Sequence, residues 1–341
     1  MDSLTHVVLG GCLGQVVLGK KLGRKAIVWG AIADTIPDLD VFCNFFVHPV
    51  NGLLIHRGFT HSILFAFLGS FFFGKLLYIK YKQEAATYKE WVLLMALGLF
   101  SHLFIDSLTN YGTGLLEPFC NHRFSYTTIF IADPSFTLPM LIAFVVLMFK
   151  NISHTLKLKF AVVALIFSGI YLVWTFKNRS HFESLFTSEF RKQNISISGQ
   201  ELTPSPLNNI LWGTMAKTDS GYYSGFSSLF SKDQHVRFHY IPKNEKLAEA
   251  FEGQKEYEML KRFAKGYSCI SILNDGIPYF HDLRFGTATG WSDTIGGFSF
   301  KYPLKLDSLD NNHLIEYSPW RAEWEGSRGL WDKIWGKGNS Q

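Results

Sequence analysis

The feature that most constrains this chain is a series of long apolar segments confined to its first half. A membrane-spanning helix needs about 20 mainly apolar residues, and about six segments before residue 177 come close to that length. They are residues 4–19, 26–46, 61–79, 91–108, 128–149 and 158–176. From residue 178 onward, polar residues, glycine and scattered charges dominate. We therefore predict an α-helical polytopic membrane domain over residues 1–177 and a soluble domain over residues 178–341.

Prolines, in one case together with an aspartate, interrupt two of these segments. Segment 26–46 is broken at Pro37, and segment 128–149 carries Asp133 followed by Pro134. At membrane depth such interruptions are tolerated only where other helices or a cavity satisfy the freed polar groups. The first segment follows Asp2 without a preceding basic residue, so we interpret it as a retained membrane segment rather than a signal peptide.

Lysine and arginine in the short connections predict the orientation, because these residues concentrate in cytoplasmic loops. The connections after the second and fourth segments hold only Arg57 and Arg123, whereas those after the first, third and fifth are strongly basic. The basic residues are Lys20, Lys21, Arg24, Lys25, Lys75, Lys80, Lys82, Lys89, Lys150, Lys157 and Lys159. Both chain ends, and the soluble domain with them, are therefore expected to be extracytoplasmic.

The second half shows a weaker pattern that favours a β-rich (α+β) fold. Alternating, aromatic and β-branched runs indicate strands. These runs cover residues 236–240, 267–273 and 296–302. Apolar residues at helical spacing indicate one helix over residues 244–265. We expect no regular structure after Gly326. The histidines expected at the surface are His235, His239 and His281.

Charge and cysteine content exclude two classes of site. The formal net charge of +5 is small and dispersed, so no nucleic-acid partner is expected. The four cysteines form no CxxC pair, which argues against a thiolate zinc site or a disulfide framework.

Ionisable residues at membrane depth are expensive and therefore indicate function. Those in the apolar half are His6, Asp34, Asp38, Asp40, His56, His61, His102, Asp106 and Asp133. Each lies at the start of an odd segment or at the end of an even one. The predicted topology brings all these positions to the extracytoplasmic side, so we expect one constellation at that face.

The spacing of these residues suits metal ligation. His102 and Asp106 are four apart and so share one face of a helix. Asp38 and Asp40 project to the same side if the chain is extended after Pro37. His56 and His61 are five apart, and Gly58 between them provides the break that lets both turn toward one centre.

A mixed set of histidine and carboxylate without thiolate favours zinc, with manganese or iron as alternatives. The predicted ligands are His6, Asp38, His56, His61, His102 and Asp106. Asp40 and Asp133 are candidates for a ligand, a general base or an orienting carboxylate. Arg57 and Arg123 can pair with a phosphate or an oxyanion, or equally anchor lipid headgroups. Asp34 is as readily explained as a helix cap.

Several of these motifs together resemble a known family. The motifs are Asp2-Ser3-Leu4-Thr5-His6, Pro37-Asp38-Leu39-Asp40, His56-Arg57-Gly58-Phe59-Thr60-His61-Ser62, His102-Leu103-Phe104-Ile105-Asp106 with Thr109 and Gly112, and the stretch from Pro118-Phe119 through Arg123-Phe124 to Asp133-Pro134. They resemble the YdjM-like, LexA-regulated, membrane-bound metal-dependent hydrolases over about residues 1–150. The resemblance implies a multi-pass protein of the bacterial cytoplasmic membrane with a divalent-metal site, distantly similar to zinc-dependent phospholipase C and the P1-type nucleases. It does not extend to the soluble domain.

The expected activity is hydrolysis by water that a divalent metal activates, on a phosphoester or a lipid-linked substrate at the outer membrane face. Two alternatives remain open. The same residues can bind a transported cation or relay protons in a transporter, or the metal can be structural while the soluble domain binds a partner. The predicted partners are the lipid bilayer and a lipid or phosphoester substrate.

Overall fold

The computed structural model describes residues 1–232, 235–286, 298–304 and 327–336. The chain divides into two compact units, which we call the helical unit and the sheet unit. The helical unit holds Met1–Phe45, Ile55–Lys177 and Pro206–Asn208, and the sheet unit holds Phe46–Leu54, Asn178–Ser205 and Asn209–Gln341. The chain thus passes from the helical unit into the sheet unit at Phe46 and returns to the helical unit at Ile55.

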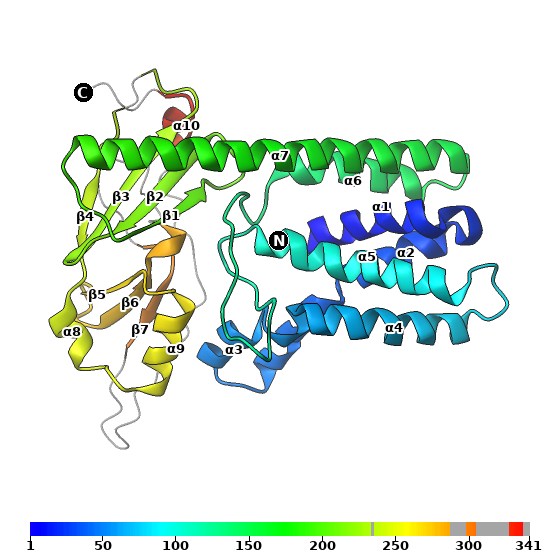
Figure 1. The fold of residues 1–341 in the computed structure, drawn as a ribbon, viewed down its shortest axis with the longest axis horizontal. Helices are drawn as coiled ribbons and strands as arrows, with labels where there is room; N and C mark the ends of the chain where they lie inside the picture. Colours follow the sequence, from blue (N-terminus) through cyan, green and yellow to red (C-terminus); the bar gives the residue numbers. More distant parts are fainter. Residues whose placement is uncertain (233–234, 287–297, 305–326, 337–341) are drawn as a thin grey trace. The chain divides into compact units, whose positions relative to one another are not determined.

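The helical unit contains the N-terminal helices of Figure 1. They are α1 (Ser3–Leu22), α2 (Arg24–Ala33), the 3-10 helices η1 (Ile36–Phe45) and η2 (Phe59–His61), α4 (Ile63–Lys80), α5 (Tyr88–Ser107), α6 (Pro134–Met148) and α7 (His154–Lys192) as far as Lys177. Among the described residues, α4, α5 and α7 are long and apolar enough to cross a membrane, and α6 is a shorter apolar helix.

The predicted break of segment 26–46 near Pro37 is present in the structure. The chain forms α2, caps it with Asp34 and continues as η1, in which Pro37 lies. Pro37 has no N–H to donate to the carbonyl of Ala33, and its ring would clash with that carbonyl in a continuous helix, so α2 ends at Ala33. Helix α7 extends well past the predicted end at residue 176.

Glycines let the helices around this break approach closely. A Cβ on Gly30 of α2 would lie 2.2 Å from the carbonyl oxygen of Gly10 in α1, and one on Gly14 would lie 2.1 Å from that of Ala26. On α5, a Cβ on Gly98 would lie 2.5 Å from the Cβ of Ala33. Small residues at this spacing are typical of tightly packed membrane helices. They bring α1 close to α2 from Ala26 to Gly30, and α5 close to the C-terminal end of α2 at Ala33.

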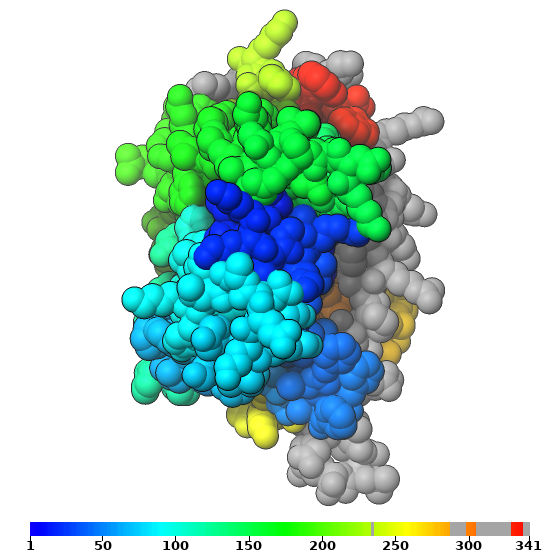
Figure 2. Space-filling view, turned by 90° about the vertical axis from the view of Figure 1, so that its right-hand side faces the viewer, coloured from blue at the N-terminus to red at the C-terminus, as the bar shows by residue number. Residues whose placement is uncertain are grey.

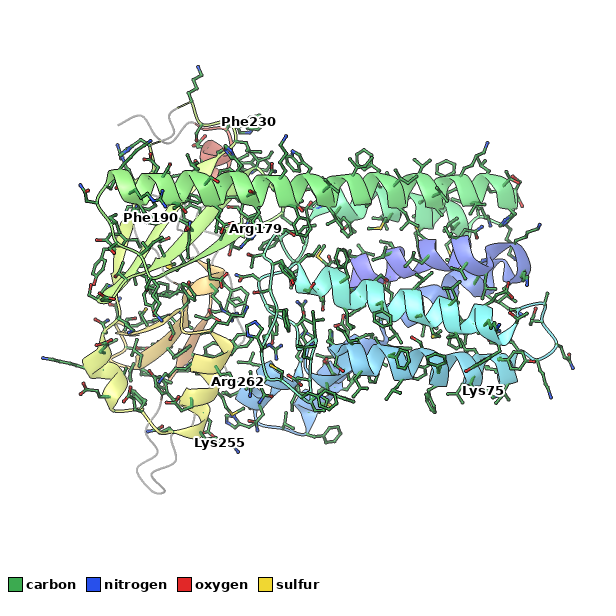
Figure 3. The ribbon with its side chains drawn as sticks, in the orientation of Figure 1. Lys75, Arg179, Phe190, Phe230, Lys255 and Arg262 are labelled. Atoms are coloured by element: carbon green, nitrogen blue, oxygen red, sulfur yellow. The ribbon has the colours of Figure 1, made fainter. Side chains whose placement is uncertain are left out.

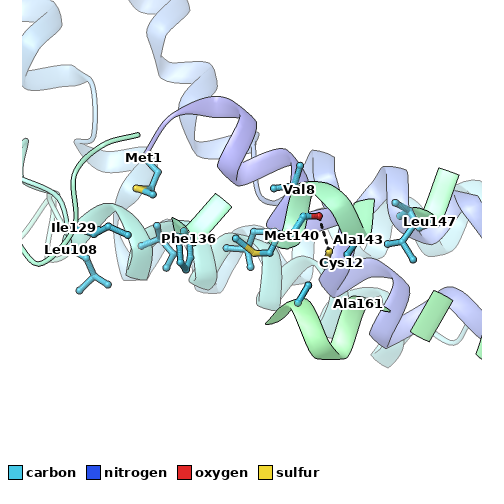
Figure 4. Close-up of a cluster of buried hydrophobic side chains, with 14 residues drawn as sticks. Met1, Val8, Cys12, Leu108, Ile129, Phe136, Met140, Ala143, Leu147 and Ala161 are labelled. Atoms are coloured by element: carbon cyan, nitrogen blue, oxygen red, sulfur yellow. Dashed lines mark hydrogen bonds between the residues drawn. The ribbon is translucent and has the colours of Figure 1, made fainter. Parts of the chain in front are cut away.

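A buried apolar cluster joins α1 to α6 (Figure 4). Val8 and Cys12 of α1 lie with Met140 and Ala143 of α6, and the Cys12 thiol donates a long hydrogen bond of 3.8 Å to the Met140 carbonyl. Cys12 lies two turns after His6 on α1, so this contact helps to hold the start of α1 in place.

The connections α1–α2, α4–α5 and α6–α7 lie on one face of the helical unit (Figure 2). Lys75 points out near this end of α4 (Figure 3). These are the connections whose basic residues predict the cytoplasmic side. The motifs with histidine and aspartate lie at the opposite ends of the helices.

The sheet unit is built on two antiparallel sheets. The first has the order β1-β2-β3-β4, from Gly199–Pro204, Leu211–Lys217, Gly221–Ser228 and His239–Pro242. The second has the order β5-β6-β7, from Ser268–Ile272, Pro278–Asp282 and Lys301–Pro303. The remaining elements are α3 (Pro49–Ile55, in this unit as far as Leu54), α8 (Glu245–Glu249), α9 (Lys255–Phe263), η3 (Leu283–Phe285) and α10 (Ser327–Ile334).

The last turns of α7 cover the first sheet. Phe182, Phe186 and Phe190 are four residues apart, so they form one stripe, and they are buried with Trp212 of β2. Phe182 stacks on Trp212 with ring centroids 5.6 Å apart. Figure 3 labels Phe190 at the end of this stripe.

Three predictions for this half are wrong. The predicted single helix is two helices, α8 and α9, because the chain turns at Gly253, where φ is +82°. The tail after Gly326 contains α10, whose Leu330 and Ile334 pack on Leu211. His281 is buried rather than at the surface. The predicted run 296–302 lies partly outside the described residues.

Candidate metal centre

Four side chains from three elements converge in the helical unit. Asp38 comes from η1, His61 from the end of η2, and His102 and Asp106 from the last turns of α5. One oxygen or nitrogen atom of each lies within 4.8 Å of the others. The side chains of His61, His102 and Asp106 are fully buried, whereas that of Asp38 is 17% exposed.

The distances among these atoms match those between the ligands of one ion. His61 Nε2 lies 3.0 Å from His102 Nε2, 3.3 Å from Asp38 Oδ1 and 3.4 Å from Asp106 Oδ2. His102 Nε2 lies 3.5 Å from each of the same two oxygens. Ligands about 2.0 Å from a tetrahedral zinc ion lie about 3.3 Å from one another. The four atoms therefore fit a single small cation.

The end of α2 fixes the orientation of His102. Its Nδ1 lies 2.6 Å from the backbone oxygen of Asp34, the C-cap residue of α2. A carbonyl oxygen can only accept, so Nδ1 carries the proton and Nε2 of the neutral ring presents a lone pair to the centre. The close approach of α2 at Gly98, one turn earlier on α5, makes this hydrogen bond possible.

Asp40 fixes the orientation of His61. His61 Nδ1 lies 3.3 Å from Asp40 Oδ2 and 3.0 Å from Thr60 Oγ1, and Thr60 itself donates to the same carboxylate oxygen at 2.9 Å. Because these partners lie at Nδ1, the proton of neutral His61 sits there and Nε2 again presents a lone pair. A carboxylate behind a histidine in this way is typical of metal ligands.

Asp34 takes part in a second group that sequence reasoning did not single out. His6, Asp34 and His102 form this group, and all three are fully buried. His6 Nδ1 lies 3.3 Å from Asp34 Oδ1, His6 Nε2 lies 3.3 Å from Asp106 Oδ1, and the His6 ring stacks on His102 at 3.8 Å. Asp34 belongs to the predicted set of ionisable residues at membrane depth, but its position at the end of a segment was as readily explained by a helix cap.

Positive groups lie beside Asp106. The Arg57 guanidinium places Nε 3.1 Å from Asp106 Oδ2 and donates to Thr109 Oγ1 at 2.7 Å, and the Met1 amino group forms a buried ion pair with Asp106 Oδ1. Arg57 has a φ of +60°, an unusual conformation for a residue with a side chain. Hydrogen bonds from Arg57 N to Asp40 and from Gly114 N to Arg57 O hold it there.

Five predicted site residues lie outside both groups in the part of the chain that the structure describes: Asp40 and Arg57, whose contacts are given above, and His56, Arg123 and Asp133. His56 is partly exposed and its Nδ1 lies 2.8 Å from Asp40 Oδ1. Arg123 donates to the backbone oxygens of His56 and Gly112. Asp133 caps α6 by accepting from Ser135 N and also accepts from the Tyr171 hydroxyl.

Comparisons with known proteins bear on the helical unit. Residues 1–182 match the family described as YdjM inner membrane protein. The chain is 32% identical over 126 residues to inner membrane protein YbcI of Escherichia coli K12, covering 36% of this chain and 69% of that protein. It is 30% identical over 141 residues to YfhP of Bacillus subtilis 168, covering 39% of this chain and 42% of that protein. No solved structure matches the chain.

Proposed function

Because the chain belongs to the YdjM family of inner membrane proteins, we propose that it is a metal-dependent hydrolase of the bacterial cytoplasmic membrane. The observation that carries this proposal is the convergence of two imidazole lone pairs and two carboxylate oxygens in a buried place. Buried acceptors that face one another are costly unless a cation lies among them. Two nitrogen and two oxygen ligands at tetrahedral spacing fit zinc best, with manganese or iron as alternatives.

Asp38, His61, His102 and Asp106 would hold a divalent cation. Bound there, it would lower the pKa of a water molecule and polarise a phosphoryl or carbonyl oxygen. Asp40 and the Asp34 carbonyl keep the two imidazoles oriented, while Arg57 offsets part of the negative charge of Asp106. His6 and Asp34 brace His102 from the other side.

We assign His56 to proton transfer. Asp40 accepts from its Nδ1 at 2.8 Å, so Nε2 of the neutral ring is free to take a proton, and the ring centroid lies 5.9 Å from that of His61. With a phosphoester as substrate, His56 Nε2 takes a proton from the attacking water molecule while the oxygen of that water bonds to phosphorus. The bond from phosphorus to the ester oxygen breaks, and the imidazolium returns the proton to the leaving alcohol.

The proposed topology has about six crossing segments, with both chain ends and the sheet unit on the extracytoplasmic side of the membrane. It is supported by the basic connections, which lie together at one face of the helical unit (Figure 2). The proposed substrate is a phosphoester or a lipid-linked molecule at the outer face of the membrane. This choice rests on the position of the motifs at the opposite ends of the helices.

The rival function is cation or proton transport by the same residues. A conduction path needs polar groups through the depth of the bilayer. Asp38 and His61 lie in short 3-10 helices, and His102 and Asp106 lie in the last turns of α5, all at one end of the unit. This grouping favours hydrolysis.

The test begins with bound metal in detergent-purified protein. We expect wild type to carry a stoichiometric divalent metal, and His102→Ala and Asp106→Ala to lose most of it. Asp133→Asn is the matched control, because it alters a buried carboxylate outside the centre. Full metal content in both alanine variants would contradict the proposed centre. A metal-supplemented screen of phosphoesters and lipids then tests hydrolysis, and transport without hydrolysis would favour the rival.

A further inference from the structure

The 3-10 helix η1 has a polar side and an exposed apolar side. Asp40 is buried, and Asp38 faces the candidate metal centre. The intervening and following side chains point away from the protein: Phe42 is 57% exposed and Phe45 is 80% exposed, and Leu39 and Val41 are about half exposed. Large apolar side chains are therefore concentrated on the same element that contributes a metal ligand.

The centre is reached from η1. Of the four converging side chains, Asp38 alone is partly exposed, and the other three are fully buried. A substrate that reaches the ligand atoms must therefore approach past Asp38, and Leu39 flanks the approach. Leu39, the next residue on η1, is 53% exposed, so an apolar side chain lies on the surface beside Asp38.

The apolar side of η1 continues into the surface of a helix that can cross the membrane. Within the helical unit, η1 packs against η2, and η2 packs against α4. Phe59 of η2 is exposed and lies against Phe65 at 5.9 Å, and Ile63 and Phe67 of α4 are exposed in turn. Soluble monomers rarely expose a contiguous apolar strip of this kind. Because α4 is long and apolar enough to cross a membrane, lipid is the expected covering of the apolar side chains beside it.

We propose that η1 lies in the membrane interface and seats the acyl chains of a membrane lipid, so that the lipid's phosphoester reaches the centre beside Asp38. We call the exposed residues Leu39, Val41, Phe42 and Phe45 the lipid shelf. The catalytic part of this inference rests on the proposed hydrolase function, whereas the contact of the lipid shelf with lipid does not. The substrate class is a phosphoester in which one of the esterified alcohols carries long acyl chains.

The first experiment tests lipid contact without activity. Cys43 is an exposed native residue of η1, so a nitroxide can be attached to it in a Cys120→Ser variant, since Cys12 and Cys269 are buried. The labelled full chain is reconstituted in vesicles of phosphatidylethanolamine and phosphatidylglycerol. We expect collisions with oxygen to exceed those with a water-soluble nickel chelate.

Two labels calibrate this measurement in a background without the exposed cysteines. A label at Phe72→Cys, on the exposed surface of α4, reports lipid, and a label at Asn151→Cys, in the exposed α6–α7 connection, reports water. A value at Cys43 near that of Phe72→Cys supports the proposal. A value equal to that of Asn151→Cys would overturn it.

The second experiment tests the substrate class. The double variant Phe42→Ser and Phe45→Ser is compared with wild type on a long-chain phospholipid and on a short-chain soluble ester with the same headgroup. We expect the ratio of kcat/KM for the long-chain over the short-chain ester to fall about tenfold or more, because two apolar contacts are lost. The control is Phe149→Ser, an exposed residue at the end of α6, with an unchanged ratio.

The outcomes separate the two proposals. An unchanged ratio in the double variant would reject the lipid shelf as a substrate site. Failure of wild type to hydrolyse either ester would reject the proposed function, and the nitroxide result would still decide whether η1 contacts lipid.

Discussion

At the scale of single residues, the role of each histidine follows from the partner of its Nδ1 atom. The Asp34 carbonyl and Asp40 direct the Nε2 atoms of His102 and His61 toward Asp38 and Asp106. His56 also hydrogen-bonds to Asp40, but its ring is more exposed than the ring of His61. One carboxylate thus orients a proposed metal ligand and a proposed proton carrier.

We predict that His56→Gln lowers kcat by about a hundredfold or more while the bound metal is retained, because proton transfer by a positioned side chain contributes about 10²–10⁴-fold. Metal content and kcat are measured on the same preparation. The control is Asn151→Gln, on an exposed connection. Loss of the metal together with activity would instead make His56 a ligand.

A second residue-scale prediction concerns His281 in β6. Burial lowers its pKa to about 4, with a smaller effect from Lys301, whereas its ordinary pKa is 6.5. Between these values the unfolded chain binds more protons, so the stability of the sheet unit falls as pH drops from about 6.5 to 4, by roughly 1.4 kcal/mol per unit at most. Thermal unfolding of the full chain against pH measures this dependence.

Two variants separate His281 from the other titrating groups. His281→Gln is expected to flatten the pH dependence in this window, and Ser271, whose hydroxyl lies 2.7 Å from His281 Nε2, can still hydrogen-bond the new amide. His181→Gln, at an exposed position on α7, is expected to leave the dependence unchanged. An unaltered slope in His281→Gln would contradict the prediction.

Sequence reasoning named Asp38 and Asp106 as ligands but did not distinguish the roles of Asp34 and Asp133. Asp34 and Asp133 look alike, since each lies near a proline at the edge of an apolar segment. Asp133 precedes its helix, where free backbone N–H groups attract a carboxylate. Asp34 ends its helix among carbonyl oxygens, so its carboxylate turns to His6 and Ser101. Which end of a helix each one occupies depends on where the helices break.

At the scale of elements, the glycine contact between α1 and α2 determines where His6 and Asp34 meet. Runs of apolar residues in the sequence identify the helical segments, because the lipid bilayer and the protein core both favour apolar side chains. It does not find how closely two helices approach, which depends on a few small residues. The break of segment 26–46 into α2 and η1 was signalled by Pro37, yet its consequence, a ligand-bearing 3-10 helix, depended on packing against η2 and α5.

We predict that Gly30→Val destabilises the helical unit by about 1–3 kcal/mol and lowers its metal content, because the new side chain must displace the Gly10 backbone. Thermal unfolding in detergent and metal analysis measure the two effects. Gly169→Ala is the control: its Cβ would meet no atom within 4 Å, so metal content should not change. Equal behaviour of the two variants would show that the close contact is not needed.

At the scale of the whole molecule, the proposed orientation can be tested on intact cells. In a background without exposed cysteines, a membrane-impermeant maleimide should label Ser196→Cys, in the sheet unit, and not Asn151→Cys, in the α6–α7 connection. Permeabilised cells provide the control, because both cysteines should then react. Labelling of Asn151→Cys in intact cells would reverse the topology.

The segment Phe46–Leu54 has a consequence for how the centre is assembled. It joins η1, which bears Asp38 and Asp40, to His56 and His61, and its Val50 is buried with Phe251 and Phe280 in the core of the sheet unit. Closing a free loop costs entropy, and a loop whose middle is already folded costs less. We therefore expect folding of the sheet unit to lower the entropy cost of bringing Asp38 together with His61. Removing residues 178–341 should raise that cost, because Val50 would lose its apolar partners Phe251 and Phe280.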